Sequence, residues 1–192
     1  MSPTIPKRAL LQAMFLTAAG VILPKAQALA ARQPRALVAY FSRTGNTRVI
    51  ANQIRRARNA TLFEINPATP YPEDYQATVA QAAAETESAY LPPLKQLVAD
   101  IQSYEEVFLG FPIWGMTAPP VIRSFLVTHD LTGKPVVPFV THGVYGLGNS
   151  IGVVEAHASK DTVRRGFSLE ADQEKRTLET VSAWLDALPP TD

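Results

Sequence analysis

The stretch Ala36-Leu37-Val38-Ala39-Tyr40-Phe41-Ser42-Arg43-Thr44-Gly45-Asn46-Thr47 decides the fold. Its first six residues suit a short buried strand, the next six form a hydroxyl-rich turn, and residues 48–58 are mostly good helix formers. Such a strand, turn and helix point backbone N–H groups and the positive end of the helix dipole at one spot, which favours an anion. Gly45 can adopt the positive φ that a tight turn often needs. Because the hydroxyls of Ser42, Thr44 and Thr47 and the amide of Asn46 add donors, the stretch predicts a phosphate site.

Two common phosphate chemistries are excluded by the residues present. The chain has no Gly-x-x-x-x-Gly-Lys-Ser/Thr motif, so no lysine is placed for a nucleoside triphosphate. It has no cysteine, which excludes a phosphatase with a cysteine nucleophile. The alternative to a ligand site is a turn that only caps the helix, with Thr44 or Asn46 as the N-cap.

Apolar runs suited to strands alternate with helical segments along the rest of the chain. The expected strands are residues 36–41, 61–65, 106–110, 135–141 and 163–169. The expected helices are residues 47–57, 75–87, 120–128, 148–157 and 172–188, and Pro92-Pro93 is expected to start a short helical turn. This alternation predicts an α/β fold in which helices cover both faces of a parallel sheet. In the strand order 2-1-3-4-5, the loops after the first, third and fourth strands meet at one cleft.

Four segments of the chain, in the same order, resemble flavodoxins, in particular the short flavodoxin-like proteins of bacteria. They are Tyr40-Phe41-Ser42-Arg43-Thr44-Gly45-Asn46-Thr47, Tyr71-Pro72-Glu73-Asp74-Tyr75, Gly110-Phe111-Pro112-Ile113-Trp114 and Pro138-Phe139-Val140-Thr141-His142-Gly143. The resemblance runs from about residue 36 to residue 188, and the first segment looks like the FMN phosphate loop of that family. It implies a flavodoxin-like three-layer sandwich, with a five-stranded parallel sheet in the order 2-1-3-4-5, and FMN as the cofactor.

The predicted FMN-binding residues lie in three loops. They are Ser42, Arg43, Thr44, Gly45, Asn46 and Thr47 in the first loop, Pro112, Ile113, Trp114 and Gly115 in the second, and Thr141, His142, Gly143, Tyr145, Gly146 and Gly148 in the third. No catalytic residue and no metal ligand is predicted. The third loop departs from the family, which commonly has Gly-Gly-Ser-Gly where this chain has Gly143-Val144-Tyr145-Gly146.

Aromatic residues and glycines give these loops their expected roles. Trp114 offers a large flat face for a flavin ring, and the alternative is that it is a core tryptophan, as we expect for Trp184. The resemblance implies that a peptide at Gly115 reorients with the redox state of the flavin. Tyr145 can cover the other face of the ring, whereas His142 closes a strand, where a structural role is favoured over proton donation.

Acidic and metal-binding patterns give little further information. Glu73 and Asp74 are expected to be first-turn acids, favourable to the dipole of the helix near residue 75. No carboxylates or histidines have metal-ligand spacing, and no Ser-His-Asp set has a recognisable nucleophile turn. Any redox chemistry would therefore belong to the cofactor.

Residues 1–30 have the pattern of a secretory signal peptide, and the alternative is a retained N-terminal membrane anchor. Lys7-Arg8 precede an apolar run over residues 9–23, and the small-x-small motifs Ala26-Gln27-Ala28 and Ala28-Leu29-Ala30 follow. This pattern predicts that a flavodoxin-like domain, residues 31–192, is exported to the periplasm. A cofactor loaded in the cytoplasm would require the twin-arginine route, for which Lys7-Arg8 is a partial match.

The charge of the predicted domain excludes some partner classes. Three of the 18 basic residues lie in residues 1–30, which leaves 15 basic and 17 acidic residues beyond them. With no large basic field, we expect no nucleic-acid partner, and we expect no stable membrane insertion after the signal is removed. The absence of cysteine agrees with an oxidising compartment.

Three functions follow as hypotheses. The first is an exported FMN-binding electron-transfer protein, whose partner is a redox protein or a small-molecule electron acceptor. The second is an FMN-dependent reductase that acts on quinones or similar acceptors. The third is a flavodoxin-fold binding module without a redox role, in which the altered third loop accommodates another ligand.

Overall fold

The computed structural model describes residues 35–143, 146–158, 160–170 and 174–188. The predicted signal segment, residues 1–30, and Tyr145 lie outside these ranges. No helix among the described residues is long and apolar enough to cross a membrane.

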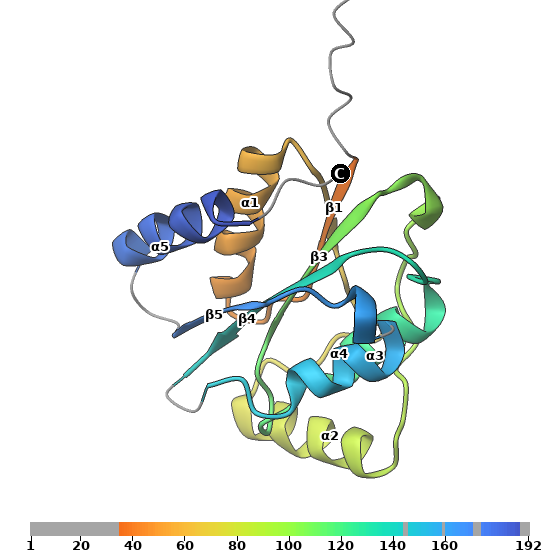
Figure 1. Ribbon diagram of the computed structural model, residues 1–192. Helices are drawn as coiled ribbons and strands as arrows, with labels where there is room; N and C mark the ends of the chain where they lie inside the picture. The colour runs from red at the N-terminus through yellow and green to blue at the C-terminus, as the bar shows by residue number, and fades with distance from the viewer. Residues whose placement is uncertain (1–34, 144–145, 159, 171–173, 189–192) are drawn as a thin grey trace, which may run out of the picture. The chain divides into compact units, whose positions relative to one another are not determined.

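A five-stranded parallel sheet forms the centre of the described part of the chain (Figure 1). The strands are β1 (Ala36–Tyr40), β2 (Thr61–Glu64), β3 (Glu106–Pro112), β4 (Val136–His142) and β5 (Phe167–Glu170). Their order is β2-β1-β3-β4-β5, and each neighbouring pair is parallel. The predicted α/β class and strand order are therefore confirmed.

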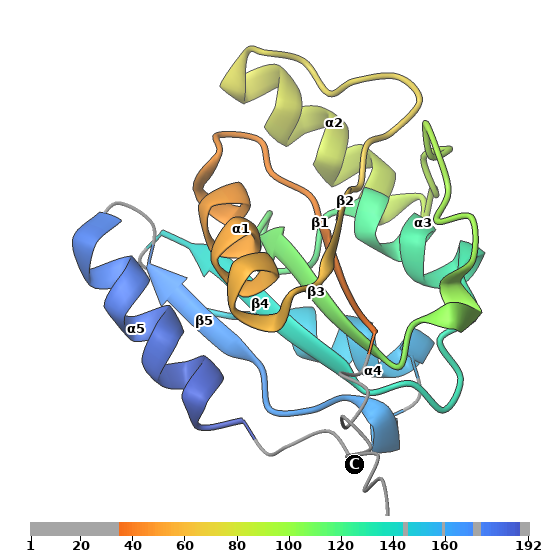
Figure 2. The ribbon, with the colours of Figure 1, turned by 90° about the horizontal axis from the view of Figure 1, so that it is seen from above.

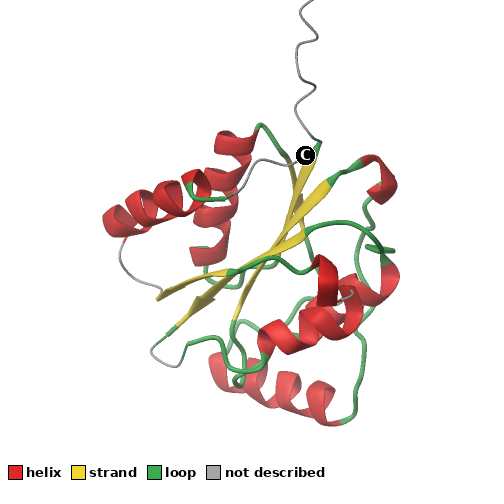
Figure 3. Ribbon diagram, in the orientation of Figure 1, coloured by secondary structure: helices red, strands yellow, loops and turns green. Residues whose placement is uncertain are grey.

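Helices cover both faces of the sheet, which gives the three layers that the sequence predicts (Figures 1 and 3). They are α1 (Asn46–Arg58), α2 (Tyr75–Glu87), α3 (Pro120–Thr128), α4 (Ser150–Ala158) and α5 (Glu174–Asp186), with short 3-10 turns at Ile101–Ser103 and Lys160–Thr162. α1 and α5 lie on one face, whereas α3 and α4 lie on the other, as the view from above also shows (Figure 2). α2 lies on the same side as α3, with which it is in contact.

Alternating side chains of the strands divide the core into two clusters. In β1, Leu37 and Ala39 face the cluster beneath α3 and α4, while Val38 and Tyr40 face the cluster beneath α1 and α5. This period of two is the geometry of a strand buried on both faces. Trp184 packs against the second cluster, where its ring stacks on Phe167 with centroids 4.9 Å apart, which confirms its expected place in the core.

Two expected elements differ in the structure. Pro92-Pro93 starts no helical turn, because the chain pairs there with residues 66–68 in extended form. Two backbone hydrogen bonds, of 2.7 and 2.8 Å, flank an antiparallel bridge between Pro67 and Leu94. The strand expected over residues 163–169 begins only at Phe167. Val163 still forms an isolated parallel bridge with Val136, and the N–H of Arg164 donates to the carbonyl of Val136 at 2.8 Å, but residues 164–166 separate this bridge from the strand.

The parallel arrangement brings three loops to one edge of the sheet. β1, β3 and β4 end at this edge, and the connection from β1 runs to the opposite side of the sheet from that of β3. A ligand crevice is expected where the direction of the connections changes in this way.

Candidate functional site

The loop after β1 leaves the N-terminus of α1 open. Gly45 stands at the N-cap with φ 98°, and no side chain of the described residues caps the first N–H groups of the helix. Ser42 Oγ instead accepts from the N–H of Gly45, at 3.1 Å, which tightens the turn. The alternative prediction, that Thr44 or Asn46 caps the helix, is therefore wrong. Uncapped N–H groups and the helix dipole together favour a negative group.

Thr47 has a different role from its neighbours in this loop. It is 1% exposed, and its hydroxyl lies 2.8 Å from the hydroxyl of the buried Thr141 in β4. This hydrogen bond joins the first turn of α1 to the end of β4. Thr47 thus holds two of the predicted loops together, while Thr44 and Asn46 line the pocket between them.

The loop after β3 is a tight hairpin turn. The N–H and carbonyl groups of Trp114 and Thr117 are paired in both directions, at 3.0 and 3.1 Å. The two residues between them, Gly115 and Met116, have φ of 54° and 64°, as a type I′ turn requires at both positions. Met116 is one of few residues other than glycine with positive φ here, so the turn carries backbone strain.

The side chain of Trp114 packs against the core and also reaches the pocket. Its ring makes edge contacts with Phe41 and Tyr71, at centroid distances of 5.2 and 4.9 Å, and packs against the core. It is nevertheless only partly buried and lines the pocket. Packing against Phe41 and Tyr71 therefore fixes the orientation of the ring that Trp114 presents to the pocket.

The loop after β4 divides into a lining part and a supporting part. Thr141, His142 and Gly143 line the pocket, and His142 Nδ1 lies 2.5 Å from the carbonyl of Gly143. Gly148 does not line it. A β-carbon at Gly148 would lie 2.0 Å from the carbonyl oxygen of Met116, so this glycine is needed where the third loop passes the second.

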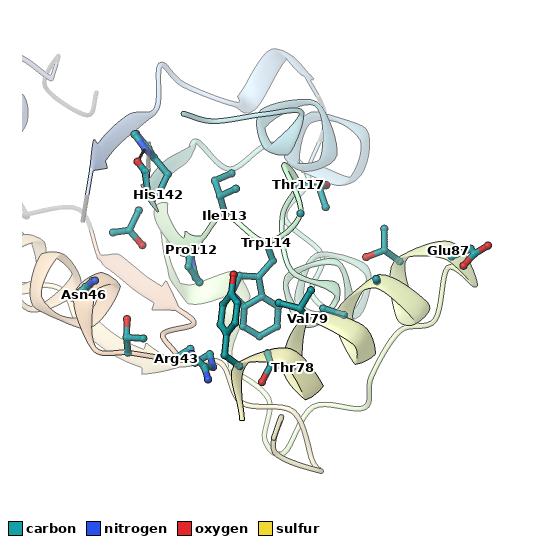
Figure 4. Close-up of a pocket in the computed structure, with 18 residues that line it drawn as sticks. Arg43, Asn46, Thr78, Val79, Glu87, Pro112, Ile113, Trp114, Thr117 and His142 are labelled. Carbon is teal, nitrogen blue, oxygen red and sulfur yellow. Dashed lines mark hydrogen bonds between the residues drawn. The ribbon is translucent and has the colours of Figure 1, made fainter. Parts of the chain in front are cut away.

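Together these loops enclose a pocket of about 550 Å³, a size typical of small-molecule sites (Figure 4). The predicted residues that line it are Arg43, Thr44, Asn46, Pro112, Ile113, Trp114, Gly115, Thr141, His142 and Gly143. The predicted residues that do not line it are Ser42, Gly45, Thr47, Gly146 and Gly148. No group of three or more His, Cys, Asp or Glu residues in the described ranges is arranged to hold a metal ion.

One wall of the pocket comes from α2, which the sequence did not indicate. The additional lining residues are Tyr75, Thr78, Val79, Ala82, Ala83, Thr86 and Glu87 of α2, together with Thr117. The spacing of Tyr75, Val79 and Ala83 by four residues is a signal for one helix face. It gave no indication of what that face meets, because α2 follows a long excursion from β2.

Hydrogen bonds at its start fix α2 beside the first loop. Asp74 caps the helix, with its Oδ1 accepting from the N–H of Ala77 at 2.7 Å. The prediction that Glu73 and Asp74 lie in the first turn is wrong, because the helix begins only at Tyr75 and its first turn contains no acid. The guanidinium of Arg43 donates to the carbonyl of Glu73 at 2.7 Å and lies 5.7 Å from the ring centroid of Tyr75. Arg43 therefore joins the loop after β1 to the α2 wall.

A partly buried polar pair, Tyr71 and Glu85, supports the α2 wall. The hydroxyl of Tyr71 donates to Glu85 Oε2 at 2.8 Å, and Gln81 donates to Glu85 Oε1 at 2.8 Å. Burial and the neighbouring carboxylate raise the pKa of Tyr71 well above its usual value, so the phenol stays protonated as a donor. Because Tyr71 also contacts the ring of Trp114, this pair links α2 to the aromatic side of the pocket.

Comparison with known proteins agrees with this arrangement. The sequence model of the flavodoxin family matches residues 35–188. A solved structure from Bacteroides eggerthii, of a protein classed as a flavoprotein, is 35% identical and covers 80% of this chain and 96% of its own, with a TM-score of 0.68. A second, from Bacteroides uniformis and classed in the same way, is 30% identical and covers 81% of this chain and 99% of its own, with a TM-score of 0.71.

A more distant structure shares the fold. It is a flavoprotein in complex with FMN from Lactobacillus acidophilus, 19% identical, which covers 76% of this chain and 99% of its own, with a TM-score of 0.62. A search of curated protein sequences found no match. The family match spans the sheet, all three loops and the α2 wall. This chain belongs to the flavodoxin family.

Proposed function

We propose that this protein binds FMN in the pocket between the three loops and α2 and transfers electrons. The observation that carries the proposal is the uncapped N-terminus of α1, which opens beside a pocket with a partly exposed tryptophan. A phosphate at one end and a flat ring along the walls match these two features. The flavoprotein relatives support the same assignment.

The first loop would hold the phosphate. Its backbone N–H groups at the start of α1 supply partial positive charge, and the side chains of Thr44 and Asn46 are at the pocket surface. Arg43 also lines the pocket, but its guanidinium is engaged with Glu73 and Tyr75 of the α2 wall. The phosphate site is therefore built chiefly from dipoles and neutral donors.

The second and third loops would hold the ring. Pro112, Ile113 and Trp114 would supply apolar contact on one side, and Thr141 and His142 lie at the end of the neighbouring strand β4, with Gly143 directly after it. Bound FMN would supply one- or two-electron redox chemistry. The protein would orient the ring, exclude water from the ring faces and present backbone groups of the strained turn to its edge.

Titration of the purified domain with FMN tests this proposal. We expect micromolar or tighter binding, with a shifted flavin absorbance spectrum and quenched flavin fluorescence. A folded domain that leaves FMN fluorescence unchanged at micromolar flavin would overturn it and would favour the binding module without a redox role.

A second candidate function is an FMN-dependent reductase of quinones or similar acceptors. The α2 wall favours it, because Tyr75 and Val79 line the pocket yet are 62% and 45% exposed. Such a surface can accept a second flat apolar molecule. Rapid steady-state turnover of NAD(P)H with a quinone would establish this function, whereas slow turnover with efficient reduction of a redox protein would establish the carrier.

We also propose that the domain acts in the periplasm. The support comes from the basic start, apolar run and small-residue motifs of residues 1–30. Fractionation of cells that express the full chain tests this, and a mature form in the periplasm is expected. Loss of that form in a strain without the twin-arginine translocase would assign the route, and a membrane-bound full-length form would instead establish the N-terminal anchor.

A further inference from the structure

A second cavity lies on the side of the molecule formed by α3 and α4. It has a volume of about 550 Å³ and is open to solvent. It shares no lining residue with the pocket between the three loops and α2, which we call the FMN pocket after its proposed ligand. We call the second cavity the α3–α4 groove. It is lined from three parts of the chain. The lining residues are Arg123 and Val127 of α3, Ala89 and Leu91 after α2, and Asn149, Gly152, Val153, Ala156 and His157 at the start of α4 and within it.

The guanidinium of Arg123 in this groove is short of hydrogen-bond partners. Its Nε is buried without a partner among the described residues, and its Nη2 makes one long contact, 3.4 Å, with the hydroxyl of Thr117. No carboxylate of the described residues pairs with it. A charged group with few hydrogen-bond partners is costly to bury. The buried Nε is closed to a ligand, so an anion in the groove would pair with the terminal nitrogens of Arg123, of which Nη2 makes only the long contact with Thr117 within the described ranges.

The remaining polar groups described in the groove bring no negative charge beside Arg123. His157 Nδ1 donates to the carbonyl of Val153, at 2.8 Å, so Nε2 of that tautomer is an acceptor and does not bind the anion. The backbone N–H of Asn149 donates to the carbonyl of Met116 at 2.9 Å, and Asn149 lines the groove. No acidic residue of the described ranges lines the groove. Its charge is therefore positive around Arg123.

The rest of the groove is apolar. Val127 is 56% exposed and Leu91 is 40% exposed, and they lie in the same lining as Val153 and Ala156. Gly152 in α4 leaves open space, since a β-carbon there would meet no atom within 4 Å. One cationic group beside an apolar trough suits a ligand with an anionic end and an aliphatic body.

We propose that the α3–α4 groove binds a small amphipathic organic acid, with its carboxylate on Arg123 and its alkyl chain along Leu91, Val127 and Val153. The site is independent of the FMN pocket, so the proposal stands or falls separately from the proposed function. Arg123 contacts Thr117, and Asn149 contacts Met116, so an acid bound here would lie against the turn that lines the FMN pocket.

Calorimetric titration of the flavin-free and FMN-treated domain with octanoate tests the proposal. We expect saturable one-to-one binding of octanoate, weaker binding of the uncharged octanol, and affinity that rises from butyrate through hexanoate to octanoate. The rise is limited to about fourfold per methylene, the value for complete burial. No saturable binding at low-millimolar octanoate, or equal binding of octanol, would overturn the proposal.

Variants separate the two parts of the site. Arg123→Gln should weaken octanoate binding about tenfold or more, because a charge-assisted hydrogen bond is lost. Gly152→Leu fills the groove without positive-φ strain and with better helix propensity, so the variant should fold and lose binding. Arg56→Gln, an exposed change on α1, is the matched charge control and should bind as the parent does. Parental binding in either groove variant would contradict the assignment.

Discussion

The helices α1 and α2 both begin beside the pocket proposed to bind FMN, but their first turns are built differently. The start of α2 is closed, because Asp74 Oδ1 accepts the N–H of Ala77 at 2.7 Å. The start of α1 is open, with Gly45 at the N-cap and no capping side chain in the part of the chain that the structure describes. A capped helix end therefore contributes to stability, whereas an uncapped end beside a pocket keeps its hydrogen-bond donors for a ligand.

The largest test of this difference places a negative charge at the open end. Asn46→Asp should weaken FMN binding by about a hundredfold, because like charges a few ångström apart in a partly buried site repel by about 3 kcal/mol. Without FMN the same change should stabilise the domain by about 0.3 to 1 kcal/mol through the helix dipole. Fluorescence titration and urea unfolding measure the two effects.

The matched control is Gln76→Asp, which adds the same charge to the first turn of α2. Gln76 is exposed and does not line the pocket, so FMN affinity should stay near the parental value. An equal loss of affinity in both variants would mean that the charge acts through the overall field and not at the α1 end.

The second test concerns Thr47, which lies in the first turn of α1 but bonds to Thr141. Thr47→Val should destabilise the domain by about 1 to 3 kcal/mol, since it leaves the Thr141 hydroxyl buried without a partner. The double variant with Thr141→Val should recover much of this loss, and urea unfolding of all four proteins measures the coupling. A loss of FMN affinity as large as that of Asn46→Asp would contradict the structural role of Thr47.

The third test removes the cap of the closed end. Asp74→Ala should cost about 1 kcal/mol of stability, the usual value of an N-cap side chain, with a smaller effect on FMN affinity than Asn46→Asp. Thermal unfolding with and without FMN measures both quantities. Unchanged stability would show that the hydrogen bond between Asp74 and Ala77 contributes little to the start of α2.

The smallest effect is expected at another closed end, the C-terminus of α3. The ring of His129 donates from Nδ1 to the carbonyl of Phe125 at 2.9 Å and accepts at Nε2 from the N–H of Val98 at 3.0 Å. Burial lowers the pKa of His129, so the unfolded chain takes up a proton more readily than the folded one. Stability from this group is present above about pH 6.5 and is lost as the pH falls below it.

Comparison of the parent with His129→Gln measures this contribution. Urea unfolding at about pH 8 and about pH 5 should show a smaller loss of stability in the variant than in the parent, because its residue 129 does not titrate. Identical pH dependence of the parent and the variant would contradict a neutral His129 ring that donates one hydrogen bond and accepts another.

Much of the fold followed from local patterns in the sequence. Buried parallel strands such as β1 are continuous apolar runs, and a run of this kind is recognisable without knowledge of its partners. Pro92-Pro93 was misjudged because pairing with residues 66–68 overrides the tendency of proline to begin a helix. The start of β5 was misplaced because Val163 continues the apolar pattern and pairs with Val136, whereas residues 164–166 interrupt the pairing before Phe167.

The site was predictable only where a loop directly follows a strand. Residues such as Asn46 and Trp114 are placed at the pocket by the end of their own strand, so their position is a local property. The α2 wall was missed because Tyr75 and Val79 reach the pocket through a tertiary contact that no local pattern encodes. Gly148 was assigned to the ligand, whereas it makes room for the carbonyl of Met116, a contact between two loops far apart in the sequence.

The most direct test of the account compares FMN with riboflavin, which lacks the phosphate, on the parent and on Asn46→Asp. We expect riboflavin to bind the parent at least about a hundredfold more weakly than FMN, because the open α1 end loses its anion. We also expect Asn46→Asp to weaken FMN but not riboflavin. Equal affinities of the parent for the two flavins, or an equal effect of the substitution on both, would contradict the claim that the uncapped N-terminus of α1 binds the phosphate.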